Sequence, residues 1–117
     1  MAKAKRVLFV CEGNLHRSST AQRLYSSTPG IKARSAGLSS LAPVQVTDEL
    51  LAWADVVFVM EREHQQWIAM RFEGLKLSRV DVLDIPDEFE LMDPALIEML
   101  RLMLDPEIDY LLSSELG

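Results

Sequence analysis

The stretch Val7-Leu8-Phe9-Val10-Cys11-Glu12-Gly13-Asn14-Leu15-His16-Arg17-Ser18 combines the patterns of a strand, a tight loop and the start of a helix. Its four consecutive apolar residues, 7–10, are typical of a β-strand buried on both faces. Gly13 and Asn14 then interrupt the apolar run, and they are the residue types that most readily adopt the positive φ angles of tight loops. A helix is expected from Ser18 onward, directly after the loop.

Strands and helices are expected to alternate beyond this stretch. Further strands are predicted at 31–36, 56–60 and 80–83, and further helices at 48–54 and 61–72. This alternation predicts an α/β fold, a three-layer sandwich with a four-stranded parallel sheet, in a single domain spanning 1–117. Ligands of such folds bind beyond the carboxyl ends of the strands, which is where the loop after the first strand would lie.

Two Asp-Pro pairs near the C-terminus, Asp93-Pro94 and Asp105-Pro106, each predict a helix start, with aspartate as the cap and proline in the first turn. The apolar residues between the pairs cover more than one face of a helix. That helix is therefore either deeply buried or partly covered by a partner subunit. In the helix before the fourth strand, Trp67 and Met70 are expected to face inward, with Ile68 as a third candidate.

Composition and charge exclude several classes of protein. One cysteine among 117 residues cannot form an internal disulfide or a multi-cysteine zinc site. The formal net charge is −6, and no run of Lys or Arg could follow a phosphate backbone, which argues against a nucleic-acid partner. The acidic excess lies in residues 81–117, so a local anion site in the first half is still possible. The first apolar run is too short for a signal peptide or a membrane span, so a cytoplasmic protein without a membrane partner is expected.

The spacing of a cysteine, five residues, an arginine and a serine between a strand and a helix predicts a cradle for a dianion. Backbone N–H groups of the loop, the positive end of the helix and the planar guanidinium of Arg17 would all point at the anion. The same groups would stabilise Cys11 as a thiolate, the nucleophilic form. The alternative is a buried cysteine that ends a strand. The strand–loop–helix context favours the functional interpretation, which needs neither metal nor cofactor.

The chain resembles the low-molecular-weight protein tyrosine phosphatases at several positions. Residues 10–18 with Ala21-Gln22 resemble the opening motif of that family. Arg34-Ser35-Ala36-Gly37, Ala54-Asp55 ahead of a strand that ends in Val59-Met60, and residues 84–89 resemble its later landmarks. The resemblance spans most of the chain and implies the strand order 2-1-3-4. It implies Cys11 as the nucleophile and Arg17 as the clamp for the phosphoryl oxygens.

The resemblance also implies roles for the neighbours of these two residues. Ser18 would hydrogen-bond the sulfur, and Asn14 would hold the loop by bonding to neighbours such as Ser35. Phosphate would be bound by the whole loop, that is by Glu12, Gly13, Asn14, Leu15, His16, Arg17 and Ser18.

The general acid of the family is an aspartate in an Asp-Pro-aromatic loop near the C-terminus, and three aspartates compete for that role here. Asp87 follows Ile85-Pro86 and has an aromatic residue, Phe89, two positions later, but it lacks the following proline. Asp93 has the proline but already serves as a helix cap, and Asp84 is expected to end the fourth strand. Asp87 is the preferred candidate, and Phe89 would stack against an aromatic leaving group.

Two departures from the family affect redox chemistry and substrate choice. His16 occupies the position of a second loop cysteine, so a protective disulfide with Cys11 is absent. The chain is also shorter than is typical, with the missing stretch between Gly37 and Thr47, where a substrate-facing wall would be expected. The resemblance thus leaves the substrate open.

By resemblance, the chain is expected to be a phosphomonoesterase that acts on phosphotyrosine or another aryl phosphate through a phosphocysteine intermediate. Its partner would be a phosphorylated protein or a small aryl phosphate, and the chain would be a monomer or weak homodimer. The alternatives are a phosphoarginine phosphatase, an arsenate-reductase-like enzyme and a non-catalytic phosphate- or phosphoprotein-binding module. Leu15 counts against the phosphoarginine phosphatase because that subgroup tends to have threonine there, and the lone cysteine counts against arsenate reduction.

Overall fold

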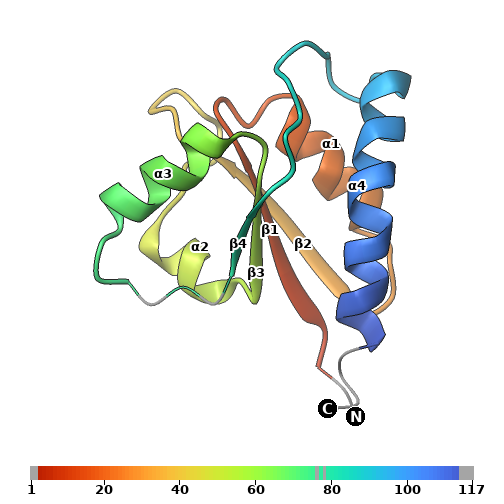
Figure 1. Cartoon of the computed structure of the whole chain (residues 1–117), viewed down its shortest axis with the longest axis horizontal. Helices are drawn as coiled ribbons and strands as arrows, with labels where there is room; N and C mark the ends of the chain where they lie inside the picture. The colour runs from red at the N-terminus through yellow and green to blue at the C-terminus, as the bar shows by residue number, and fades with distance from the viewer. Residues whose placement is uncertain (1–2, 76, 78, 114–117) are drawn as a thin grey trace.

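Strands and helices alternate along the whole of the computed structural model, which describes residues 3–75, 77 and 79–113 (Figure 1). The strands pair in parallel in the order β2-β1-β3-β4, which confirms the predicted fold class and strand order. The elements are β1 (Lys5–Cys11), α1 (Arg17–Tyr25), β2 (Ile31–Gly37), α2 (Asp48–Trp53), β3 (Val56–Val59), α3 (Arg62–Arg71), β4 (Val80–Val82) and α4 (Pro94–Ser113).

The central strand β1 is covered on both faces, as its continuous apolar run predicts. On one face, Val7, Phe9 and Cys11 pack with α1 and α4. On the other face, Leu8 and Val10 pack with α2 and α3. Figure 1 shows these two pairs of helices on opposite sides of the sheet. Residues 7–10 are completely buried, so two separate hydrophobic clusters hold β1 in place.

The carboxyl ends of three strands meet at one edge of the sheet. Cys11 at the end of β1 is in register with Gly37 at the end of β2, and Val10 is in register with Val59 at the end of β3. Residues that directly follow these strands are therefore brought together, although they are far apart in the sequence.

The helix start predicted at Asp105-Pro106 is wrong, because α4 continues from Pro94 to Ser113 with Pro106 inside it. One face of α4, with Leu100 and Leu104 fully buried, packs on the sheet along the whole helix. Proline at position 106 has no N–H to donate to the carbonyl group of Leu102. That carbonyl lies on the outer face, where the side chain of Leu102 is 76% exposed and water can take the place of the missing donor.

The inward face of α3 also differs from the prediction. Trp67 and Met70 are exposed, and the buried side chains are Ile68, the third candidate, and His64. A histidine holds the inward position because it is engaged in hydrogen bonding at the start of the helix, as described below. None of the helices in the described ranges is long and apolar enough to cross a membrane.

Candidate active site

The loop after β1 is held by backbone contacts with the end of β2. The N–H groups of Leu38 and Ser39 donate to the carbonyl oxygens of Cys11 and Glu12, at 3.1 and 2.9 Å. A Cβ atom on Gly37 would lie 2.7 Å from the Glu12 oxygen and 3.0 Å from the Asn14 nitrogen, so only glycine allows this approach. Asn14 adopts a left-handed φ of 57°, as expected for its residue type in a tight loop.

The sulfur of Cys11 is surrounded by hydrogen-bond donors. The backbone N–H of Asn14 donates to Sγ at 3.2 Å, and the hydroxyl of Ser18 lies 3.1 Å from it. The side-chain amide of Asn14 donates to the Ser18 oxygen at 2.9 Å, which leaves the Ser18 hydrogen free to point at the sulfur. Both groups are therefore in a position to donate a hydrogen bond to negative charge on the sulfur.

Helix α1 begins at Arg17 with its positive end toward the loop. Its N-cap residue, His16, makes no side-chain capping bond, and the first turn contains no acidic residue. The positive end of the helix is therefore not neutralised from within the helix and can act on an anion in the loop. Leu15 and His16 in this loop are exposed.

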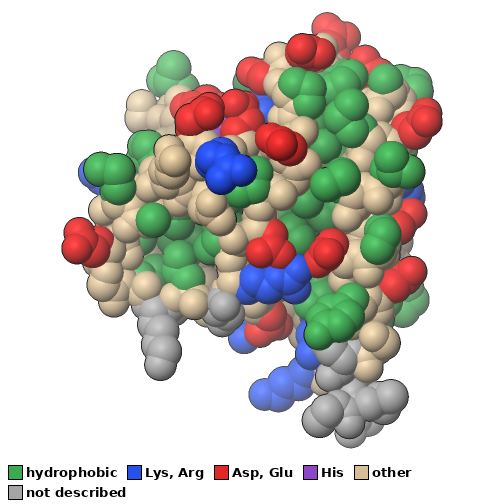
Figure 2. Space-filling model, viewed as in Figure 1, with side chains coloured by type: hydrophobic (Ala, Val, Ile, Leu, Met, Phe, Trp, Pro, Cys, Tyr) green, Lys and Arg blue, Asp and Glu red, His purple; other side chains and the backbone are tan. Residues whose placement is uncertain are grey.

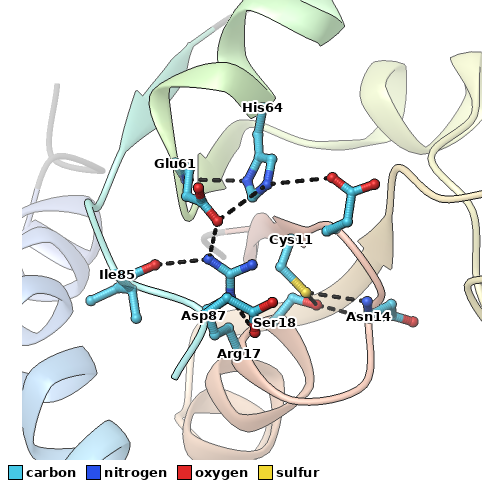
Figure 3. Close-up of polar contacts among 9 residues, drawn as sticks. Cys11, Asn14, Arg17, Ser18, Glu61, His64, Ile85 and Asp87 are labelled. Atoms are coloured by element: carbon cyan, nitrogen blue, oxygen red, sulfur yellow. Dashed lines mark hydrogen bonds and ion pairs between the residues drawn. The ribbon is translucent and has the colours of Figure 1, made fainter. Parts of the chain in front are cut away.

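The guanidinium of Arg17 is only 2% exposed and is held by two other segments of the chain (Figure 3). Its Nη1 donates to Oε2 of Glu61, after β3, at 2.6 Å and to the carbonyl oxygen of Ile85, after β4, at 2.8 Å. Its Nε lies 3.8 Å from a carboxylate oxygen of Asp87. In Figure 3 the guanidinium lies between Glu61 and Ile85 on one side and Cys11 on the other.

Glu61 and His64 form a pair at the start of α3. The N–H of Glu61 donates to Nδ1 of His64 at 3.1 Å, and the Glu61 carboxylate accepts the backbone N–H of His64, which together make a capping box. Nε2 of His64 faces carboxylate oxygens of Glu12 and Glu61 at 4.0 and 3.8 Å. The hydrogen bond from Arg17 lowers the pKa of Glu61, while burial lowers the pKa of His64, so His64 is neutral near pH 7.

The structure separates two of the three acid candidates. Asp87 is 65% exposed beside Arg17, whereas Asp93 accepts a hydrogen bond from the N–H of Ala95 at 2.8 Å and so caps α4. Asp84 is exposed with a φ of 63°, just after the end of β4. Phe89 is partly buried and packs against the core cluster of α1 and α4.

One expected contact is not found, and two residues were missed. Asn14 bonds to Ser18 and to Ser19 rather than to Ser35, whose hydroxyl donates to Gln22 of α1 at 2.5 Å. Glu61 and His64 were not predicted as site residues. Because Glu61 follows directly after Val59-Met60, at the carboxyl end of a strand beside β1, the binding-edge rule could have identified it.

Acidic side chains gather around the site. Figure 2 shows them at the upper end of the molecule, where β1 and β3 end in Figure 1. The exposed acidic residues of the segments that surround Arg17 are Glu12, Glu63, Asp84, Asp87, Glu88 and Glu90. In the described part of the chain, no three His, Cys, Asp or Glu side chains are grouped so as to hold a metal ion.

A parallel sheet of this order, with a loop between β1 and the N-terminus of α1, belongs to the class of α/β proteins that bind ligands at the carboxyl ends of their strands. The chain is 30% identical over 114 residues to the probable low molecular weight protein-tyrosine-phosphatase EpsP of Ralstonia nicotianae, covering 77% of this chain and 78% of the relative. It therefore belongs to the low-molecular-weight protein-tyrosine-phosphatase family and is a phosphatase. No family model matches the chain.

Solved structures show the same fold over nearly the whole chain. The YwlE arginine phosphatase of Geobacillus stearothermophilus is 25% identical, with a TM-score of 0.76 over 96% of each chain. The tyrosine phosphatase Wzb of Escherichia coli K30 in complex with phosphate is 22% identical, with a TM-score of 0.65 over all of both chains. The second likeness shows the fold alone.

Proposed function

We propose that the chain hydrolyses phosphomonoesters through a phosphocysteine intermediate, with Cys11 as the nucleophile. The observation that supports this most strongly is the set of contacts around the Cys11 sulfur. The sulfur accepts a hydrogen bond from the Asn14 N–H and faces the Ser18 hydroxyl. It lies at the end of β1, where the loop that leads into the uncapped positive end of α1 begins. These groups would hold a thiolate and a phosphate dianion in the same cradle.

The reaction proceeds by two in-line displacements. The Cys11 thiolate attacks phosphorus, the bond to the leaving oxygen breaks, and Asp87 donates a proton to that oxygen. Asp87, now ionised, accepts a proton from water, which attacks phosphorus and releases phosphate and the thiolate. Arg17 and the N–H groups of residues 12–18 hold the equatorial oxygens throughout. Asp87 suits the proton transfer by its position, because its exposed carboxyl group lies 3.8 Å from Nε of Arg17, the residue that would hold the phosphoryl oxygens.

The proposed substrate is phosphotyrosine in a protein or a small aryl phosphate. The relative EpsP is named as a tyrosine phosphatase, and Phe89 lies two residues after Asp87, where it could meet an aromatic leaving group. Phosphoarginine is the second candidate because the similar YwlE structure is an arginine phosphatase. Comparing kcat/KM for free phosphotyrosine and phosphoarginine decides between these two substrates. We further propose that residues 1–117 form one domain.

The proposed roles are tested with p-nitrophenyl phosphate and phenyl phosphate. Cys11→Ser should abolish turnover of both esters, and turnover that remained would contradict the mechanism. A chain that binds phosphopeptide tightly without any turnover would instead be a binding module.

Asp87→Asn should reduce kcat for phenyl phosphate by a factor of about 100 to 10,000. Its effect on p-nitrophenyl phosphate should be smaller, because that leaving group needs less protonation. Asp93→Asn is the matched control and should affect both esters equally and only through the stability of α4. If Asp93→Asn gave the selective loss, Asp93 rather than Asp87 would be the acid.

A further inference from the structure

Arg17 is oriented by contacts outside the phosphate-binding loop. Both bonds of its Nη1 go to segments that follow other strands, namely the Glu61 carboxylate at 2.6 Å and the Ile85 carbonyl at 2.8 Å. This nitrogen is thereby fully engaged, whereas Nη2 makes neither of these bonds. A planar guanidinium fixed at one nitrogen has its remaining N–H groups fixed in direction as well.

The Glu61 carboxylate is itself held in place by the start of α3. It caps the helix by accepting the backbone N–H of His64, while its own N–H donates to the buried Nδ1 of His64 at 3.1 Å. Glu61 is one-third exposed, whereas His64 is buried, so the residue that holds Glu61 at the start of α3 is itself fixed in the fold. The position of α3 and the direction of the Arg17 guanidinium are thus linked through one side chain.

We propose that Glu61 is a positioning residue that orients Arg17 for the phosphoryl oxygens of the transition state. This inference rests on the proposed function of the site. Glu61 does not touch the substrate. It acts by holding Nη1. The Nη2 and Nε donors of Arg17 then point at the phosphoryl oxygens and do not have to reorient during the reaction.

The inference predicts that kcat and anion affinity respond differently when the carboxylate is removed. A neutral residue at position 61 leaves the charge of Arg17 less neutralised, so affinity for a phosphate dianion should stay equal or increase. The orientation of the guanidinium becomes less defined at the same time, so kcat should fall. A purely structural role would lower both through partial unfolding.

Two variants separate orientation from helix capping. Glu61→Asp keeps the charge and places a strong capping residue at the start of α3, but its side chain is one methylene too short to keep the 2.6 Å bond to Arg17. Glu61→Gln keeps the reach and a neutral acceptor but is a weaker cap. Stability should therefore be highest in Glu61→Asp, lower in the wild type and lowest in Glu61→Gln. In contrast, kcat should be highest in the wild type, lower in Glu61→Gln and lowest in Glu61→Asp. The matched control is Glu49→Gln, which removes an exposed carboxylate from the first turn of α2.

We expect kcat for p-nitrophenyl phosphate to fall by a factor of about 10 to 100 in Glu61→Asp. The inhibition constant of inorganic phosphate should be unchanged or lower in Glu61→Gln, and Glu49→Gln should behave like the wild type. Full kcat in Glu61→Asp, or a kcat that follows stability across the series, would overturn the inference. So would weaker phosphate inhibition with kcat unchanged.

A second measurement is independent of turnover. In wild-type protein, NMR should show a slowly exchanging Nη1–H signal of Arg17, assigned by its loss in Arg17→Lys. The signal should exchange faster in Glu61→Asp and be unchanged in Glu49→Gln. If the wild type lacked activity but showed this pattern, the proposed function would fail and the positioning role would stand. An unchanged signal in Glu61→Asp would overturn the role.

Discussion

The Ser18 hydroxyl connects the conformation of the loop to the chemistry of the sulfur. Asn14, in its left-handed conformation, donates to the Ser18 oxygen and so directs the Ser18 hydrogen toward Cys11. The contact between Ser18 and the sulfur agrees with the expectation from the sequence. The partner of Ser35 could not be predicted, because its bond to Gln22 depends on how α1 lies against β2.

His64 should make the protein less stable in mild acid. Burial lowers the pKa of His64, so the unfolded chain binds a proton at this residue before the folded chain does. The free energy of unfolding should therefore decrease as pH falls below about 6.5, by at most about 1.4 kcal/mol per pH unit, and level off below the lowered pKa. Glu61, whose pKa is also lowered, loses its stabilising effect only in a separate window that begins near pH 4.5.

The test is urea denaturation of the wild type and of His64→Gln between pH 8 and 5. Glutamine retains an acceptor for the Glu61 N–H at this helix position and has no proton to bind in this range. The decrease in stability near pH 6 should be reduced in the variant, so the two stabilities should converge in acid. Parallel profiles would show that His64 does not cause the decrease. Glu12, Arg17 and Asp87 also lie close enough to act on His64, and they are present in both proteins.

Among the elements, the central strand was the easiest to predict and α4 the hardest. Four apolar residues in succession predict β1, because a strand that is buried on both faces needs apolar side chains at consecutive positions. In α4 the local signal at Asp105-Pro106 indicated a helix start, but packing of Leu104 and Ile108 against the core continues the helix through the proline. Asp105 accepts a hydrogen bond from Tyr25 of α1 at 2.5 Å instead of capping a helix. A local sequence pattern cannot predict tertiary contacts of this kind, which here decide where the helix begins and ends.

Replacing Pro106 by alanine should stabilise the protein. Proline in a helix interior costs about 3 kcal/mol relative to alanine, partly offset by the stiffer unfolded chain, so a gain of about 1 to 2 kcal/mol is expected. Pro94→Ala is the matched control, because proline at the first helical position sacrifices no hydrogen bond, and it should change stability by less than about 0.5 kcal/mol. Chemical denaturation measures both. A loss of stability in Pro106→Ala would mean that the proline ring itself is needed for the packing of α4.

At the scale of the whole molecule, the sequence predicts some residues of the candidate site but not their neighbours from other strands. The loop at 11–17 was predicted from its spacing and Asp87 from the family resemblance, and in the structure Arg17 and Asp87 lie close together. Glu61 reaches Arg17 because β3 lies next to β1 in the sheet, across 44 positions of sequence. The short motif around Arg17 carries no information about Glu61, so their contact could be found only from the order of the strands in the sheet.

The distribution of charge predicts a preference among phosphopeptides. Exposed carboxylates such as Glu12, Asp87 and Glu88 surround the site in a chain of net charge −6. Phosphotyrosine peptides with basic flanks should therefore have a higher kcat/KM than peptides with acidic flanks at low salt. The difference should shrink at about 0.5 M NaCl, where the Debye length is only a few ångströms.

A phosphotyrosine peptide with uncharged flanks serves as the control and should show little dependence on salt. The expectation is contradicted if the ratio of kcat/KM between basic and acidic peptides stays constant as salt is raised.

Gly37 restricts how the sequence of this chain can change over generations. A side chain at this position would collide with the backbone of the loop after β1, whereas a Cβ at Gly13 would meet nothing within 4 Å. Position 37 is therefore closed to every other amino acid as long as the loop keeps its present path. The end of β2 and the loop after β1 therefore constrain each other's sequence, although the two segments are separate along the chain.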